Sequence, residues 1–416
     1  MSILDPKPET AQRDDLRQIQ LERLQATLNR AYRNVLLYRE KFNKAGVLPE
    51  QVRSLEDLAC FPRTTREDLL AHQPFGLFAV PLHDVVRLHP AAGAGGPVVV
   101  GYTHNDIAVW TRMAARALTS AGVTKEDVVQ ISLDYAQDAA GMGAQSAAEL
   151  LGASVIPASG LAPKRQAELL KNYRVTVLIA TPNQALHLAQ TLGSEDPAPL
   201  SLRSAFLVAH AWTPDLHKEI EERLQIKTYA SYGLSEMTEP GLATECGEHN
   251  GLHLSEDNFL AEILDPETGA PLAAGQAGEL TLTTLTREAT PLIRYRTGCL
   301  AILHPEPCAC GRTLQRIELV SGRIDNIVTV EGVRLTLEQV QEVVNDLLPG
   351  APCNLAVLQE DGAETLEVRI AIDDPSLFAD QMKHMQALRE HIKAHLFEHL
   401  GLWTVVRLVE QTREEK

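Results

Sequence analysis

Five residues in two separate segments have the types and the spacing of a metal site. Cys246, His249 and His253 lie in ATECGEHNGLHL, and Cys308 and Cys310 lie in EPCACGRT, where a Cys-x-Cys-Gly turn is typical of half a metal site. Three thiolates and one imidazole make a closed tetrahedral set for zinc, with no open position for catalysis. The sequence does not decide whether His249 or His253 is the fourth ligand. The alternative to a metal site is that the thiols are free in loops.

Two further segments have the chemistry of phosphate and metal binding. Gly93, Gly95 and Gly96 lie in HPAAGAGGPVVVGYT, and a glycine-rich backbone offers N–H groups to phosphate. A plain surface loop explains these glycines equally well. The segment SYGLSEM offers an aromatic face, a hydroxyl donor and the carboxylate of Glu236, a hard oxygen ligand. The alternative is that SYGLSEM is a turn with a purely structural role in packing.

Length and composition limit the kind of protein that carries these residues. The chain has 416 residues, enough for two domains, with 44% hydrophobic and 22% charged residues, as in ordinary globular proteins. Its net charge of −17 argues against nucleic-acid binding and against electrostatic membrane binding. No apolar run reaches a membrane span, and six cysteines are too few for a disulfide scaffold. We expect a cytoplasmic protein.

The elements that position these residues follow from hydrophobic periodicity. Residues 15–45 have helical spacing, and Ser54 and Thr64 or Thr65 are candidate helix caps. From about 128 to 235 short apolar runs alternate with amphipathic helices, which predicts a mainly parallel sheet with helices on its faces. In such sheets the ligand-binding and catalytic residues usually lie in the loops at the carboxyl ends of the strands.

Two more patterns follow. Residues 258–321 have the pattern of a hairpin and further extended segments, which predicts a β-rich subdomain. Beyond it come a hairpin, a helix capped by Thr336, two strands, a long helix over MKHMQALREHIKAHLFEHL and a last strand. The predicted fold class is α/β. An N-terminal domain over 1–321 contains the sheets, and a small α+β lid over 322–416 is hinged near GRID.

These segments together resemble the AMP-forming acyl-CoA ligase superfamily, and within it the phenylacetate-CoA ligase type. The resemblance covers nearly the whole chain and is carried by AYRNVLLYREKFNKAGV, SLEDLACFPRTTREDL, PFGLFAVP, VVVGYTHND, SYGLSEMTEPGLATEC, GLHLSED, PLIRYRTG and GRIDNIVTVEGV. It implies that ATP and Mg²⁺ activate a carboxylic acid as an acyl-adenylate. The acyl group then passes to CoA while the lid rotates between the two half-reactions.

The resemblance assigns roles to residues that match the family's motifs. Tyr232 and Gly233 would lie near adenine, Ser235 would meet phosphate and Glu236 would hold Mg²⁺. Ser235 and Glu236 are therefore the catalytic candidates.

The same resemblance gives roles to the hinge and to the metal set. In GRID, Arg323 would contact nucleotide and Asp325 would be the pivot of the lid. Some relatives hold a structural zinc through residues that match Cys246, His253, Cys308 and Cys310. Cys60 and Cys353 are expected to be core thiols.

Four departures from the family pattern affect ATP binding. The phosphate loop lacks its hydroxyls and has Gly96 in place of Lys, and VAHAW, which includes Ala209 and His210, replaces a Gly-Ala-Glu-Pro-Trp run at the adenine pocket. Cys299 replaces the Asp that binds the ribose, and a thiol is a poor substitute for a carboxylate. The loop with the catalytic Lys is missing after the last strand, so we expect a lid that is truncated at its end.

Three interpretations of function stay open. The first is an active ligase that uses ATP, Mg²⁺, CoA and a carboxylic acid, with Tyr135 a candidate for lining the acid pocket. The second is a catalytically impaired relative that binds nucleotide, acyl-CoA or a protein partner. The third is a CoA thioester enzyme with Cys299 as nucleophile, although a buried Cys is usually inert. The residues do not name the acid, and they do not decide whether the chain is a homodimer.

Overall fold

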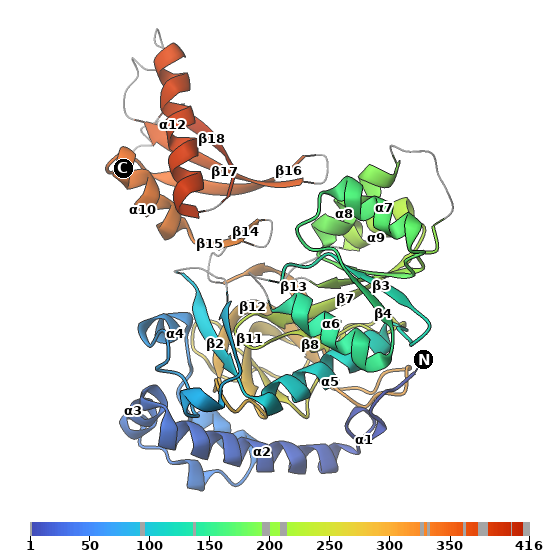
Figure 1. Cartoon of the computed structure of the whole chain (residues 1–416). Coiled ribbons are helices and arrows are strands. Elements are labelled where there is room, and N and C mark those ends of the chain that lie inside the picture. Colours follow the sequence, from blue (N-terminus) through green and yellow to red (C-terminus); the bar gives the residue numbers. More distant parts are fainter. Residues whose placement is uncertain are drawn as a thin grey trace. The chain divides into compact units, whose positions relative to one another are not determined.

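The chain forms two compact units, one of residues 1–91 and 98–324 and the other of residues 92–97 and 325–416. The computed structural model describes residues 2–91, 96–135, 139–193, 200–208, 214–324, 328–330, 333–360, 363–372, 382–400 and 402–410 (Figure 1). Each unit has its own hydrophobic core.

The larger unit opens with a short helix that the sequence analysis did not predict, α1 (Pro6–Glu9). The predicted helical stretch over 15–45 forms two helices, α2 (Arg13–Asn34) and α3 (Leu36–Ala45), and a predicted cap precedes α4 (Arg66–Ala71). Of the two candidate caps before α4, Thr65 is the N-cap, since its hydroxyl accepts a hydrogen bond from the Asp68 backbone N–H at 3.3 Å. The prediction that Cys60 is a core thiol is wrong: it is exposed, because the short helix Leu55–Cys60 turns Leu55 and Leu58 inward instead. Cys353 is buried, as predicted.

An 11-stranded sheet runs through the larger unit in the order β10-β11-β12-β13-β9-β8-β7-β6-β5-β3-β4. Its parallel part is β3 (Val128–Ile131), β4 (Ser154–Pro157), β5 (Val177–Ala180), β6 (Ser204–Val208) and β7 (Lys227–Leu234). The helices of this part are α5 (His104–Ser120), α6 (Ala140–Leu151), α7 (Pro163–Asn172), α8 (Pro182–Gly193) and α9 (Pro214–Leu224). The predicted parallel sheet flanked by helices is therefore confirmed.

The parallel strands are apolar on both faces, and each face belongs to a different core. Val177 and Ile179 of β5 share one core with residues of α5 and α6, whereas Leu178 and Ala180 share the other with residues of α7, α8 and α9. Strand residues alternate between faces, so a run apolar throughout must be covered on both sides. Figure 1 shows α7, α8 and α9 grouped together, apart from α5 and α6.

The strands after β7 are antiparallel and continue the same sheet. They are β8 (Thr238–Thr244), β9 (Leu252–Leu254), β10 (Phe259–Leu264), β11 (Ala277–Thr284), β12 (Tyr295–His304) and β13 (Arg316–Arg323). The predicted hairpin is β10 and β11, which pair from Phe259 opposite Thr284 to Leu264 opposite Glu279. A separate two-stranded sheet, β1 (Arg87–Ala91) with β2 (Val98–Tyr102), flanks the glycine-rich segment.

The described part of the smaller unit contains a three-stranded sheet, two helices and a hairpin. Its elements are β14 (Val328–Val330), β15 (Val333–Leu335), α10 (Leu337–Leu347), β16 (Cys353–Glu360), β17 (Ala363–Ile372), α12 (Met382–Leu400) and β18 (Thr404–Glu410). The strand order is β16-β17-β18, with β17 and β18 parallel. Thr336 caps α10 as predicted. Val340 and Val344 of α10 and Ile392 and Leu396 of α12 are buried in its core.

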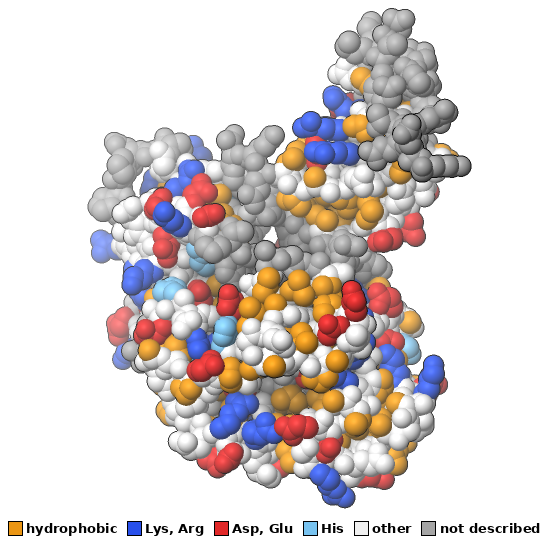
Figure 2. Space-filling view, turned by 180° about the vertical axis from the view of Figure 1, so that it is seen from behind, with side chains coloured by type: hydrophobic (Ala, Val, Ile, Leu, Met, Phe, Trp, Pro, Cys, Tyr) orange, Lys and Arg blue, Asp and Glu red, His pale blue; other side chains and the backbone are white. Residues whose placement is uncertain are grey.

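Among the described residues, no helix is both long enough and apolar enough to cross a bilayer. On the face shown in Figure 2, Lys and Arg side chains are interspersed with Asp and Glu side chains.

Candidate functional site

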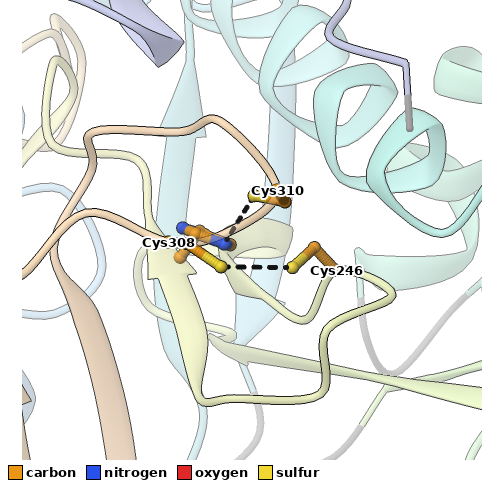
Figure 3. Close-up of side chains that lie close together, drawn as sticks. Cys246, Cys308 and Cys310 are labelled. Carbon is orange, nitrogen blue, oxygen red and sulfur yellow. Dashed lines mark hydrogen bonds between the residues drawn. The ribbon is translucent and has the colours of Figure 1, made fainter.

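The predicted metal ligands come together from three parts of the larger unit. Cys246 follows β8, His253 is on β9, and Cys308 and Cys310 lie in the loop between β12 and β13. Their ligand atoms all lie within 4.8 Å of one another. Figure 3 shows the three cysteine side chains pointing toward a common centre, with the Sγ atoms of Cys246 and Cys308 3.8 Å apart. Residues 62 positions apart therefore form one cluster.

The cluster has the dimensions of a tetrahedral zinc site. Two thiolates at a Zn–S distance of about 2.3 Å are about 3.8 Å apart in a tetrahedron, and the pair Cys246–Cys308 has that separation. The Sγ of Cys310 lies 3.4 Å from Nε2 of His253, so the imidazole presents this nitrogen to the thiols. The donor set therefore fits zinc in both type and spacing.

The surroundings of the cluster shift the pKa of its ligands in different directions. Burial, with the nearby Cys310 and Cys308, raises the pKa of Cys246 to about 12. Burial also acts to raise the pKa of Cys310, but hydrogen bonds from the backbone and side chain of Arg312 outweigh it and lower that pKa. Burial, with Arg312 and Arg316 nearby, lowers the pKa of His253 to about 4, so this imidazole is neutral at pH 7. A neutral imidazole is the form that binds a metal.

The positions of the two candidate histidines decide which of them lies beside the three cysteines. His249 has a φ of 48° and lies outside the cluster, where its ring stacks on Tyr229 with centroids 5.3 Å apart. Its Nδ1 lies 3.6 Å from a carboxylate oxygen of Glu245, which raises the pKa of His249. His253 is on β9, opposite Arg316 of β13 and Thr244 of β8, and so is held beside the cysteine loop.

The cysteine loop is also tied to the N-terminal segment. Arg312 donates to Sγ of Cys310 at 3.6 Å and to the carboxylate of Glu9 at 2.7 Å, and both charged side chains are buried. The Thr313 backbone N–H donates to the Glu9 carbonyl at 3.1 Å. A partner that orients a metal-ligating residue is typical of metal sites.

The glycine-rich segment connects the two strands of the β1–β2 hairpin. Gly96 has a φ of +113°, a backbone conformation that favours glycine. Gly93 and Gly95 lie outside the described residues.

The Tyr232–Glu236 segment spans the end of β7 and the turn into β8, in the middle of the large sheet. Tyr232, Ser235 and Glu236 are all buried, at 0%, 6% and 2% exposure. Gly233 has no room for a side chain, since a Cβ would lie 2.6 Å from the Thr238 carbonyl oxygen. The glycine in this motif is therefore required by the close approach of the two strands.

The carboxylate of Glu236 is bound by two residues that sequence reasoning did not identify. Arg66, the first residue of α4, forms an ion pair with Oε1 of Glu236, and the Tyr295 hydroxyl donates to the same oxygen at 3.4 Å. The side chains of Arg66 and Glu236 are 11% and 3% exposed. The Thr65 cap predicts that Arg66 begins a helix, but no local signal pairs it with a residue 170 positions away.

Cys299, the predicted ribose residue, and Arg323, in the predicted hinge motif, lie on adjacent strands. Cys299 on β12 is 4% exposed and pairs with Arg323 at the end of β13. The Cys299 backbone N–H donates to the Thr297 hydroxyl at 3.1 Å. The predicted site residues Ala209, His210 and Asp325 lie outside the described residues.

Tyr135, the candidate acid-pocket residue, packs closely on α6. A Cβ at Gly141 would lie 3.0 Å from the Tyr135 ring. Burial, with Glu149 nearby, raises the pKa of the Tyr135 phenol to about 12, so the phenol keeps its proton at neutral pH. Its oxygen is buried and has no hydrogen-bond partner within the part of the chain that the structure describes. It is thus a donor available to a ligand.

This fold and this arrangement of motifs define an adenylate-forming enzyme, and comparison with known proteins agrees. Residues 95–284 match the family of AMP-binding enzymes. The chain is 41% identical to phenylacetate-coenzyme A ligase from Escherichia coli K12, over 98% of this chain and 93% of the relative. It is 38% identical to the Thermus thermophilus protein of the same name, over 98% of this chain and 95% of that one.

Solved structures show the same likeness. A 2-hydroxyisobutyryl-CoA ligase in complex with 2-HIB-AMP and CoA has a TM-score of 0.89 and 25% identity, covering 100% of this chain and 93% of that chain. The chain belongs to the phenylacetate-coenzyme A ligase family of AMP-binding enzymes.

Proposed function

We propose that this chain activates a carboxylic acid with ATP as an acyl-adenylate and transfers the acyl group to CoA. The observation that carries this proposal is the identity of 37–44% to four phenylacetate-coenzyme A ligases. An arylacetic acid is accordingly the first substrate class to test, with phenylacetate as the probe. The unpartnered Tyr135 phenol among the described residues is the donor we assign to the acid pocket.

The proposed nucleotide site is built around the β7–β8 turn. Ser235 would meet phosphate and Glu236 would hold Mg²⁺. Glu236 is already paired with Arg66. To hold Mg²⁺, its carboxylate must either release Arg66 or bind Arg66 with one oxygen and the metal with the other. In this scheme the Arg66 guanidinium faces the buried Glu236 carboxylate while no nucleotide is bound.

The residues at the ribose and phosphate positions predict weak nucleotide binding. Cys299 offers a thiol where the family pattern has a carboxylate, and Gly96 stands where that pattern has Lys. These two positions favour a second candidate function, in which the chain binds nucleotide or acyl-CoA without turnover.

The test is calorimetric titration with ATP and with AMP in the presence of Mg²⁺, followed by an assay of phenylacetate-dependent AMP release with CoA. Micromolar ATP binding and acid-dependent AMP release support the ligase. ATP binding without AMP release, for phenylacetate and for a panel of other acids, supports the second function. No binding at millimolar nucleotide overturns both nucleotide proposals and directs the search to CoA thioesters.

We also propose that Cys246, His253, Cys308 and Cys310 hold a structural zinc ion. Four protein ligands fill a tetrahedral site, so the metal would have no open position for substrate. Its contribution is mechanical: it joins the β12–β13 loop to β8 and β9. We place the chain in the cytoplasm, where thiols stay reduced, since all six cysteines are free in the structure.

A further inference from the structure

A second group of metal-ligand side chains lies in the smaller unit, remote in sequence from the cysteine cluster. Asp346 is near the end of α10, and His395 and His399 lie four residues apart on α12, so both histidines are on one face of that helix. The three ligand atoms lie within 4.8 Å of one another. Figure 1 shows α10 beside α12 within this unit.

The separation of the ligand atoms fits coordination better than hydrogen bonding. Nε2 of His395 lies 3.5 Å from Oδ2 of Asp346, longer than a good hydrogen bond. Two ligands at about 2.0–2.1 Å from one tetrahedral ion are about 3.4 Å apart. Nε2 of His395 is also buried and has no hydrogen-bond partner among the described residues, so it is a nitrogen without an explained role.

The second histidine is already oriented as a ligand. Nδ1 of His399 donates to the backbone carbonyl of His395 at 2.9 Å, which leaves the lone pair of Nε2 available. A metal-ligating imidazole commonly donates its other N–H to a carbonyl in this way. The two rings are tilted by 56° with centroids 4.2 Å apart, so both can present a nitrogen to one ion.

We propose that Asp346, His395 and His399 form a solvent-accessible binding site for a divalent first-row transition metal. Two imidazoles and a carboxylate favour ions such as Zn²⁺, Ni²⁺ or Cu²⁺ over Mg²⁺ or Ca²⁺. The Asp346 side chain is 63% exposed and that of His395 20%, so an ion enters from solvent and water completes its coordination. The bound ion ties the C-terminal turn of α10 to the last turns of α12 and stabilises the smaller unit reversibly.

The test is titration of the full-length chain with Ni²⁺ after one equivalent of Zn²⁺ has been loaded for the cysteine cluster and unbound Zn²⁺ has been removed. We expect one further equivalent to bind. His399→Gln and Asp346→Asn, both at exposed positions, should each weaken that binding at least about tenfold, since even the loss of a residue that only orients a ligand costs this much. The matched control is His391→Gln, one turn before His395 on α12 and outside the cluster, which should bind as the unmodified chain does.

The outcomes separate this site from other histidines and from the cysteine cluster. Absence of a further equivalent overturns the proposal. Equal Ni²⁺ affinity in the unmodified chain, His399→Gln and Asp346→Asn overturns it too, because the ion is then bound elsewhere. Loss of binding in His391→Gln assigns the ion to a different histidine pair and rejects the site. Circular dichroism of each variant confirms that it is folded.

Discussion

Cys299 stands at the position that we propose for the ribose, and its thiol predicts weak nucleotide binding. Replacing it with Asp restores a charged acceptor for the ribose hydroxyls, and hydrogen bonds to charged groups contribute about 1.5–3 kcal/mol. Cys299→Asp should therefore strengthen ATP binding about ten- to hundredfold, as measured by calorimetry. Cys299→Ser is the matched control, since it keeps the size without the charge. Equal affinity in both variants would show that the ribose does not bind here.

The ion pair between Arg66 and Glu236 gives a second prediction at this scale. Both side chains are largely buried, so Arg66→Met removes the cationic partner of a buried carboxylate and should lower the free energy of unfolding by about 3–5 kcal/mol. Glu236→Gln should also destabilise the chain, because it removes the anionic partner of the Arg66 guanidinium. The double variant should recover most of the loss, since it removes both charges. Denaturant titration of the three variants measures this coupling, and additive losses would argue that the pair is not coupled.

At the scale of the element, the proposed zinc ion would join the loop between β12 and β13 to β8 and β9. Free zinc at one hundred times its Kd should stabilise the folded chain by about 2.7 kcal/mol. A chelator, or the substitution Cys308→Ser, should remove this contribution to the free energy of unfolding. The measurement is thermal unfolding with and without a zinc chelator. His249→Gln is the control, because His249 lies outside the cluster. Zinc should stabilise this variant as much as it stabilises the unmodified chain. A chain with unchanged stability after complete zinc removal would rule out the structural role.

Helices and strands could be predicted from sequence because their signals are local. The helix over 382–400, the Thr336 cap and the β10–β11 hairpin all follow from residues a few positions apart. Cys60 shows the limit of such reasoning. Its neighbours are apolar, but a short helix presents only one side to the core, and the rotation of that helix is set by packing against α2.

At the scale of the whole molecule, two compact units that share no described core residue predict two steps of unfolding. The cores of the larger unit and that of the smaller unit share no residue among those described. Calorimetry of the intact chain should resolve two transitions instead of one two-state transition. A zinc chelator should lower only the transition of the larger unit, and Ni²⁺ should raise only that of the smaller unit. A single transition that responds as a whole to both treatments would contradict this division.

The sequence by itself determined the element order, the parallel sheet, the side-chain types of the cysteine cluster and the presence of a thiol at Cys299. These depend on hydrophobic period, on turn and cap chemistry and on side-chain type, all of which are local. The tertiary structure alone decided that His253 and not His249 joins the cysteines, that Arg66 binds Glu236, and that His395 and Asp346 meet. Each of these depends on strand register or helix packing between residues far apart in the chain, and only the folded core fixes those distances.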